Sequence, residues 1–360
     1  SRPRESIRAC SPAKPAPLEG ELIAARRSAL MVDRREKGQH GLRSSWRSWL
    51  LAALLIAGLV VAVLHWGDVK RFAALVSDAK PLWLALAAGL QLATYFGLSA
   101  QWWLTLRRGR TPEKHGELFR LTFAKHFADQ VIPTAGVSGN VVLVDRLVSL
   151  GVPRGNAVAA LLLQIIAYYI SYALGALWVL VVLWWKNRAS LLLIGAVLAF
   201  LVVACGIPAL TLWLHRRGQE RLPSWLARWS KARHFFELVG EAPGKLVRDP
   251  QLIAWLTLLN GAVFLADAAT MQACLLALGV DAPLSAGYVA FMLASIAVIL
   301  GPVPMGLGSF EAVSIAMLRL FGVPFEAALS ATLLFRGFTL WLPLIPGGLL
   351  LRKEMKPAEA

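Results

Sequence analysis

Long apolar stretches with few charges constrain the fold of this chain more than any other feature. Hydrophobic residues make up 57% of its 360 residues. About 20 apolar residues span the hydrocarbon core of a bilayer, where backbone polar groups have to be satisfied within the protein, as they are in a helix. The sequence therefore predicts an all-α polytopic membrane protein. The stretches that qualify as full spans are 49–65, 82–104, 156–185, 190–214, 252–278 and 326–351.

A second feature is an internal repeat built around Pro and Gly. Residues 132–153 align with residues 303–324 without a gap, and Pro133 matches Pro304 at a constant shift (304 − 133 = 171). Pro302 adds a second proline to the C-terminal break. Paired hydrophobic segments that Gly and Pro interrupt in both halves of a membrane chain indicate a transport site.

The two interrupted segments are 117–151 and 283–322. We predict that each enters the membrane and returns as a re-entrant hairpin, beside about six full transmembrane helices, so that the repeat copies are 117–185 and 283–351. If both segments instead cross the membrane twice, the orientation of the other spans is unchanged, and the protein has eight to ten transmembrane helices.

The distribution of Lys and Arg predicts the orientation. Basic clusters occupy the N-terminal tail, residues 107–114, the loop after residue 214, and Arg352-Lys353. All of them fall in the cytoplasm if both termini are cytoplasmic, as the positive-inside rule requires of a bacterial inner-membrane protein. Three spans then separate the two copies, so we predict that the copies face opposite sides in an inverted-topology repeat.

The net charge of +16 also bears on partners. We expect no nucleic-acid partner, because no RNA- or DNA-binding motif accompanies the charge. Positive loops instead attract anionic lipid headgroups. The sequence contains no HExxH, nucleophile elbow, P-loop or DxD-type metal motif. We therefore expect no enzyme activity, no cofactor and no metal site, and the sequence sets no oligomeric state.

The predicted domain organisation is simple. Residues 1–45 form a basic tail, expected to be disordered and cytoplasmic, and residues 1–30 precede Met31, a natural start. We expect residues 1–30 to be either an upstream extension or a disordered tail. Residues 46–351 form one transmembrane domain, and residues 352–360 a cytoplasmic tail.

The C-terminal copy carries a specific pattern: P-x-P-x-G-x-G-x-F-E, then G-V-P-x-x-x-A, then an Arg inside the last span. Its residues here are Pro302, Pro304, Gly306, Gly308, Phe310, Glu311, Gly322, Pro324, Ala328 and Arg336. The pattern resembles the lysylphosphatidylglycerol synthase transmembrane-region family of flippase-like bacterial and archaeal membrane proteins. That resemblance implies a lipid translocase-like domain.

In the large two-part members of that family, a soluble domain follows and transfers an amino acid from tRNA to phosphatidylglycerol. The sequence ends nine residues past Leu351 (360 − 351 = 9). We therefore expect a stand-alone member that lacks the aminoacyltransferase domain and does not synthesise an aminoacyl lipid by itself.

The N-terminal copy departs from the commonest family form. Many members carry Gly-Glu and then Arg after the first proline, whereas this chain has Gly139-Asn140, with Arg146 further on. At the 171-residue shift Asn140 corresponds to Glu311, and Arg336 falls beside Gln164. We expect a site that is charged in one half and neutral in the other, which would suit an amphipathic substrate.

Glu311 and Arg336 are the strongest candidates for substrate binding. A charged group deep in an apolar span costs several kcal/mol unless it is paired, so such residues mark functional sites by default. One hypothesis is a structural ion pair that holds the re-entrant helix against its neighbour. The other is that both residues hold a zwitterionic or anionic headgroup, because Arg binds phosphate bidentately.

The glycine-rich run before Glu311 suggests a further part of the site. Gly306, Gly308 and Ser309 precede a short helix, whose N-terminal N–H groups and positive dipole end favour a phosphate. We predict that these residues contact the substrate.

Asp267 lies near the centre of the span 252–278, with Asn260 on the same helical face. Two interpretations are open: a carboxylate that couples transport to protons, or a structural group that pairs with a nearby Arg or caps broken backbone.

These observations leave three functional hypotheses. The leading one is movement of an anionic or zwitterionic phospholipid or polyprenyl-type lipid between leaflets. The second is a membrane subunit or partner of a soluble or membrane-bound lipid-modifying transferase, without transport activity of its own. The third is an assembly protein that transports nothing.

Overall fold

The computed structural model describes residues 77–111, 114–131, 137–218, 240, 242–301 and 306–341. All of them belong to one compact unit, residues 70–360; a second unit, residues 1–69, lies outside the described residues together with the predicted span 49–65. The described residues contain helices and no strand. This confirms the all-α class.

Four of the described helices are long and apolar enough to cross a membrane: Pro81–Arg108, Arg154–Trp185, Leu191–Trp213 and Pro250–Ala277. They coincide with the predicted spans 82–104, 156–185, 190–214 and 252–278. The protein is therefore a multi-pass membrane protein.

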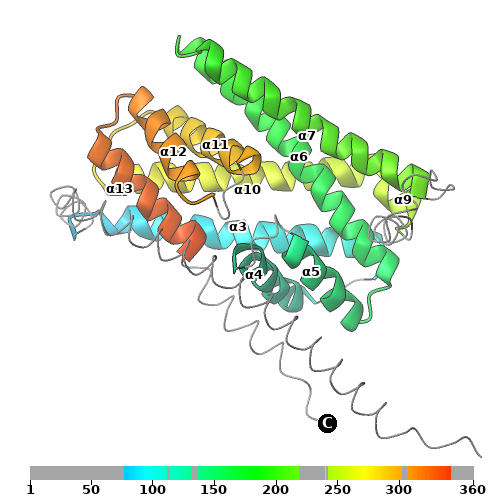
Figure 1. Cartoon of the computed structure of the whole chain (residues 1–360). Coiled ribbons are helices and arrows are strands. Elements are labelled where there is room, and N and C mark those ends of the chain that lie inside the picture. Colours follow the sequence, from blue (N-terminus) through cyan, green and yellow to red (C-terminus); the bar gives the residue numbers. More distant parts are fainter. Residues whose placement is uncertain are drawn as a thin grey trace, which may run out of the picture. The chain divides into compact units, whose positions relative to one another are not determined.

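Figure 1 shows the described helices, coloured in chain order. In order they are α3 (Pro81–Arg108), α4 (His115–Val131), α5 (Val137–Ser149), α6 (Arg154–Trp185), α7 (Leu191–Gly218), α9 (Gly244–Val247), α10 (Pro250–Ala277), α11 (Leu284–Leu300), α12 (Ser309–Leu320), α13 (Phe325–Arg336) and the π-helical turn η2 (Gly337–Trp341).

Each interrupted segment consists of two short helices, α4 with α5 and α11 with α12, and the members of each pair pack against each other. The predicted last span, 326–351, begins as α13 and continues into η2. Its remainder lies outside the described residues.

The duplication is larger than the sequence alignment suggested. The starts of α3 and α10 differ by 169 residues (250 − 81), those of α4 and α11 by 169 (284 − 115), those of α5 and α12 by 172 (309 − 137) and those of α6 and α13 by 171 (325 − 154). The predicted copies begin at residues 117 and 283 and so omit one helix of each unit, α3 and α10.

The Gly-Val-Pro sequences end α5 and α12 in the same way. Gly151 and Gly322 have φ values of +93° and +89°, a left-handed conformation that glycine adopts without steric cost. The N–H of the following valine donates to the carbonyl five residues back, at 3.1 and 3.2 Å respectively. This is a Schellman motif, and the proline after it cannot extend the helix.

α3 and α10 pack against each other in antiparallel orientation. The N–H of Lys80, just before α3, donates to the carbonyl of Ala277 at the end of α10 (2.8 Å). At the other end, Arg108 Nη1 lies 3.1 Å from Asp249 Oδ2, and Asp249 also caps the first turn of α10. A Cβ on Gly97 would lie 2.9 Å from Val263 Cγ2, so glycine allows the two backbones to approach closely.

The α4–α5 pair and the α11–α12 pair end near different ends of the α3–α10 pair. The end of α5 leads into α6, where Asn156 Nδ2 donates to the Gly109 carbonyl at the end of α3 (3.0 Å). α11 instead follows the end of α10, and at that end Arg188 donates to the Leu320 carbonyl at the end of α12 (2.8 Å). The ends of α5 and α12 therefore lie near opposite ends of the antiparallel α3–α10 pair.

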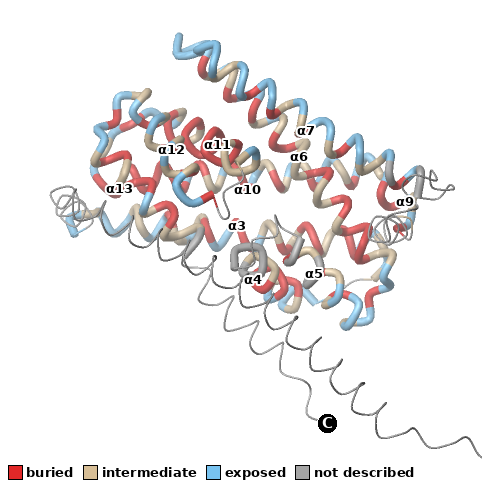
Figure 2. Tube along the Cα trace, viewed as in Figure 1, coloured by how far each residue is buried: buried red, intermediate tan, exposed pale blue. Residues whose placement is uncertain are grey.

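Small residues contribute to the helix contacts beside the larger apolar side chains. Alanines on α6, α10, α11 and α13 are buried where these helices meet, as expected where packing and not apolar transfer drives association. Figure 2 shows the buried residues on the facing sides of the helices. α7 packs mainly on α6, and its exposed residues include Leu191, Leu192 and Val202. Such a face suits contact with lipid chains.

Candidate functional site

The turn before α12 depends on glycine. Gly306 and Gly308 have φ values of +62° and +84°, which L-residues with a Cβ rarely adopt. A Cβ at Gly306 would also overlap the Val298 side chain of α11. The turn therefore lies tightly against α11 and fixes where α12 begins.

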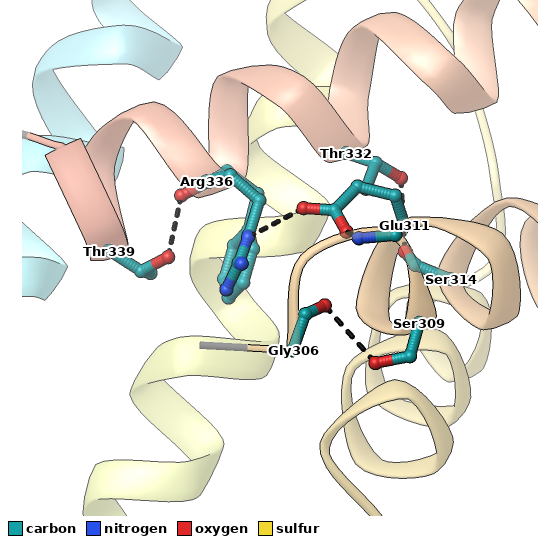
Figure 3. Close-up of polar contacts among 9 residues, drawn as sticks. Gly306, Ser309, Glu311, Ser314, Thr332, Arg336 and Thr339 are labelled. Carbon is teal, nitrogen blue, oxygen red and sulfur yellow. Dashed lines mark hydrogen bonds and ion pairs between the residues drawn. The ribbon is translucent and has the colours of Figure 1, made fainter. Parts of the chain in front are cut away.

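Glu311 occupies the third position of α12 and has a partner on each carboxylate oxygen. Its Oε2 accepts a hydrogen bond from the backbone N–H of Gly308 (2.7 Å), half of a capping box; the other half is absent because glycine has no side chain. Its Oε1 accepts from Arg336 Nε (2.8 Å), and Figure 3 shows this contact joining α12 to α13. The Arg336 and Glu311 side chains are 10% and 19% exposed.

Aromatic rings and a hydroxyl pair complete the α12–α13 contact. Arg336 Cζ lies 5.1 Å from the centre of the Phe310 ring, and Phe310 stacks on Phe335 with ring centres 5.5 Å apart. The hydroxyls of Ser314 and Thr332 are 3.0 Å apart (Figure 3). The guanidinium is thus held by charge, hydrogen bonding and a cation–π contact.

In the predicted span 326–351, Arg336 falls near the middle. It is eleven residues past Phe325, the first residue of α13 (336 − 325 = 11), which corresponds to about 17 Å along a helix. A hydrocarbon core is about 30 Å thick. The π-helical turn η2 begins at the next residue, and such turns are frequent at functional sites.

At the start of α12, where a phosphate was expected to bind, the side chains of Ser309 and Glu311 bond to the protein's own backbone. Ser309 Oγ donates to the Gly306 carbonyl (3.1 Å), and the Glu311 carboxylate lies at the positive end of the helix. An anion would meet this carboxylate first. Among the described residues of the site, the Arg336 guanidinium is the group that suits a phosphate.

The N-terminal half does not form a matching pair. Asn140 on α5 makes no side-chain hydrogen bond in the described part of the chain, and Gln164 bonds elsewhere. Gln164 Nε2 donates to Asn260 Oδ1 (3.5 Å), and Asn260 Nδ2 donates to Gln101 Oε1 (2.9 Å). Asn140 and Gln164, the expected neutral counterparts of Glu311 and Arg336, therefore do not bond to each other in the described part of the chain, because Gln164 faces α10. Pro133, Pro302 and Pro304 lie outside the described residues.

Asp267 faces α3 and has neutral partners. Its Oδ1 accepts from Gln91 Nε2 (2.9 Å) and, more weakly, from Thr94 Oγ1 (3.5 Å). Asn260, expected on the same face, bonds to Gln101 instead.

Sequence reasoning missed Gln91, Thr94 and Gln101, which are the partners of Asp267 and Asn260. One signal was available for Gln101, because it matches Gln272 at the 171-residue shift (272 − 101 = 171). Gln272 keeps a structural role, since its Nε2 donates to the Ala282 carbonyl at 2.7 Å.

No curated protein matches the chain. Residues 49–347 match the family described as lysylphosphatidylglycerol synthase TM region, and the match includes every described helix. The chain belongs to the lysylphosphatidylglycerol synthase TM region family.

Proposed function

We propose that this protein moves an anionic or zwitterionic phospholipid or polyprenyl-type lipid between the leaflets of the bacterial inner membrane. The observation that carries the proposal is the Glu311–Arg336 pair, with Nε and Oε1 2.8 Å apart. A charged pair at this depth is expensive to maintain and is a functional-site hypothesis by default. Arg provides the planar geometry that binds a phosphate group through two hydrogen bonds.

The helix lengths support re-entrant hairpins. α4 and α11 have 17 residues each, α5 has 13 and α12 has 12. At 1.5 Å per residue these helices are about 18 to 26 Å long, less than the roughly 30 Å of a hydrocarbon core. With the ends of α5 and α12 near opposite ends of the α3–α10 pair, this supports an inverted-topology repeat whose two hairpins enter from opposite leaflets.

The charge distribution supports cytoplasmic termini. The end of the helix pair where α3 ends and α10 begins is basic; its described residues include Arg107, Arg108, Arg110, Arg154, Lys245 and Arg248. The opposite end carries both signs near the helix ends, including Asp78, Lys80, Arg188 and Asp281. By the positive-inside rule the basic end faces the cytoplasm.

The proposed mechanism is an exchange of partners on Arg336. A headgroup phosphate replaces Glu311 on the guanidinium, while Glu311 keeps its bond to the Gly308 N–H. The energetic cost of separating the pair is offset by the new charge-assisted hydrogen bonds. When the hairpin returns to the paired state, the headgroup is released toward the other leaflet. No catalytic step and no metal or cofactor is part of this proposal.

Reconstitution tests the proposal. Purified protein is placed in phosphatidylethanolamine–phosphatidylglycerol vesicles with a fluorescent phosphatidylglycerol, phosphatidylethanolamine or polyprenyl phosphate, and a membrane-impermeant quencher reports the lipid that changes leaflet. We expect wild type and Arg319→Gln to move at least one of these lipids and Arg336→Gln to lose most of the rate. Arg319 is the matched control because it is an exposed arginine of α12, the helix that carries Glu311. If a folded Arg336→Gln variant moves lipid at the wild-type rate, Arg336 does not bind the headgroup.

The second candidate function is a membrane subunit or partner of a lipid-modifying transferase. The family's description, which names a synthase, favours it. No movement of any tested lipid, together with a transferase that co-purifies with the full chain, would replace the first proposal by this one.

A further inference from the structure

A carboxylate that the headgroup site does not use lies between α3 and α10. Asp267 is ten residues before Ala277, the last residue of α10 (277 − 267 = 10), and Gln91 is ten residues after Pro81, the first residue of α3 (91 − 81 = 10). Both are therefore about 15 Å from the same end of the antiparallel pair, well inside a membrane of ordinary thickness.

The direct partners of Asp267 are all neutral. Gln91 Nε2 donates to Asp267 Oδ1 (2.9 Å) and also to Thr270 Oγ1 (3.1 Å), and Thr94 Oγ1 lies 3.5 Å from the same carboxylate oxygen. Among the described residues, no Lys, Arg or His nitrogen lies within 4.0 Å of the carboxylate. The structural interpretation that pairs Asp267 with an arginine finds no support there.

The titratable groups on the neighbouring helices do not provide a counter-charge either. Among the described residues, those within electrostatic range of Asp267 are phenols: Tyr95 on α3, and Tyr168 and Tyr172 on α6. Tyr169 packs edge-on against Tyr168.

The other groups near this part of the fold are engaged elsewhere. On α4, His126 lies edge-on to the Tyr95 ring. On α11, the Tyr288 hydroxyl donates to the Gly175 carbonyl (3.2 Å). On α13, Arg336 is bonded to Glu311.

An ionised carboxylate without a cation costs several kcal/mol inside a membrane, whereas a protonated carboxyl with hydrogen-bond partners costs far less. The charge of Asp267 therefore depends strongly on how much water reaches it. A conformational change that admits water favours the ionised form, and one that excludes water favours the protonated form.

A series of ring contacts leads from Phe264, on the same helix as Asp267, to the headgroup site. Phe264 is one turn before Asp267 on α10 and contacts Phe291 of α11, with ring centres 6.5 Å apart. Phe291 contacts Phe335 of α13 at 5.8 Å. Phe335 precedes Arg336 and stacks on Phe310, so a shift of α10 is transmitted by packing to the Glu311–Arg336 pair.

We propose that Asp267 is a proton-binding site whose charge sets the packing of α10 against α13, so that lipid movement is coupled to protons. One proton is taken from water at one face and forms an O–H bond with the carboxylate. It returns to water when that bond breaks, and no other covalent change occurs. The coupling to lipid movement rests on the proposed function, whereas the proton site does not.

The first test measures protonation without transport. Infrared difference spectra of the full chain in lipid vesicles are recorded from mildly acidic to mildly basic pH, and the carboxylic acid C=O band is followed. We expect a titrating band in wild type and in Asp281→Asn, and its loss in Asp267→Asn. Asp281 is the matched control because it is an exposed carboxylate just after the same helix. A band that persists unchanged in Asp267→Asn overturns the proposal.

The second test measures lipid movement against pH in the same vesicles. We expect the wild-type rate to change by up to about tenfold per pH unit, because the ratio of protonated to ionised groups changes tenfold per unit. Asp267→Asn should give a flat profile and Asp281→Asn the wild-type profile. If Asp267→Asn does not fold, Asp267→Glu takes its place and should retain a titrating band with a displaced profile.

The outcomes separate the two proposals. A titrating Asp267 band without any lipid movement supports the proton site and overturns only the proposed function. Lipid movement with the same pH profile in wild type and Asp267→Asn supports the proposed function and overturns the coupling.

Discussion

Replacing the two members of the Glu311–Arg336 pair singly and together should distinguish a structural ion pair from a headgroup site. Among the described residues, Arg336→Gln leaves the Glu311 carboxylate with the Gly308 N–H as its partner, in a position where the side chain is 19% exposed. Removing one partner of a fully buried pair costs about 3–5 kcal/mol. Because Glu311 retains a backbone partner and some exposure, we expect a loss near the lower end, about 3 kcal/mol.

The double variant Glu311→Gln/Arg336→Gln should be much less destabilised. It leaves no uncompensated charge, and two amides can hydrogen-bond to each other, so a net loss of about 1 kcal/mol is expected. The unfolding free energies of wild type, both single variants and the double variant form a double-mutant cycle. Denaturant unfolding in detergent provides these values.

Lipid movement then separates the two roles. If Arg336 binds the headgroup, the stable double variant still loses about 1.5–3 kcal/mol of charge-assisted binding, a tenfold to hundredfold lower rate. The control is the exposed pair Glu117–Arg120 on α4, 3.2 Å apart, whose double replacement should cost below about 1 kcal/mol and leave the rate unchanged. A double Glu311/Arg336 variant that is folded and moves lipid at the wild-type rate would refute the headgroup reasoning and favour a structural pair.

Three further predictions test the fold around the site. Gly306→Ala should lower the unfolding free energy by about 2 kcal/mol, because Cβ meets Val298 and a left-handed backbone is strained; Val298→Ala should recover part of this in thermal unfolding, and full stability of Gly306→Ala would contradict the turn. Asn260→Leu should cost about 1–3 kcal/mol in denaturant unfolding, because the buried Gln101 amide and the half-buried Gln164 amide lose their shared partner; a neutral effect would count against the amide cluster. In a cysteine-free background, an impermeant maleimide should label Asp281→Cys from outside the cell and Arg110→Cys only after the membrane is opened; the reverse pattern would invert the proposed topology.

Much of the fold could be predicted from the sequence, because lipid restricts the backbone to few solutions. Apolar length alone located α3, α6, α7 and α10, and the Gly-Val-Pro sequences located the ends of α5 and α12. The extent of the repeat was underestimated because α3 and α10 share few residue identities. α3 and α10 correspond to each other in helix length and in their position within the two units, since their first residues are 169 positions apart (250 − 81).

The candidate site was predicted in part. The sequence placed Glu311 and Arg336 at membrane depth, because two charged residues in otherwise apolar segments stand out. Their contact, with Nε and Oε1 2.8 Å apart, required the packing of α12 on α13. Phe310 was visible only as part of a motif, and its contact with the guanidinium depends on the side-chain directions of both helices.

What the sequence determined by itself is the helical class, the positions of the spans and breaks, and the inventory of polar residues inside the membrane. Those properties are local, since each depends on length, hydropathy or turn chemistry along one segment. Only the tertiary structure decided which polar residues meet. Asp267 bonds to Gln91 of α3. Gln164 bonds to Asn260 of α10 and not to Asn140. The reason is physical: the rotation and crossing of neighbouring helices set these pairings, and periodicity within one helix does not specify either quantity.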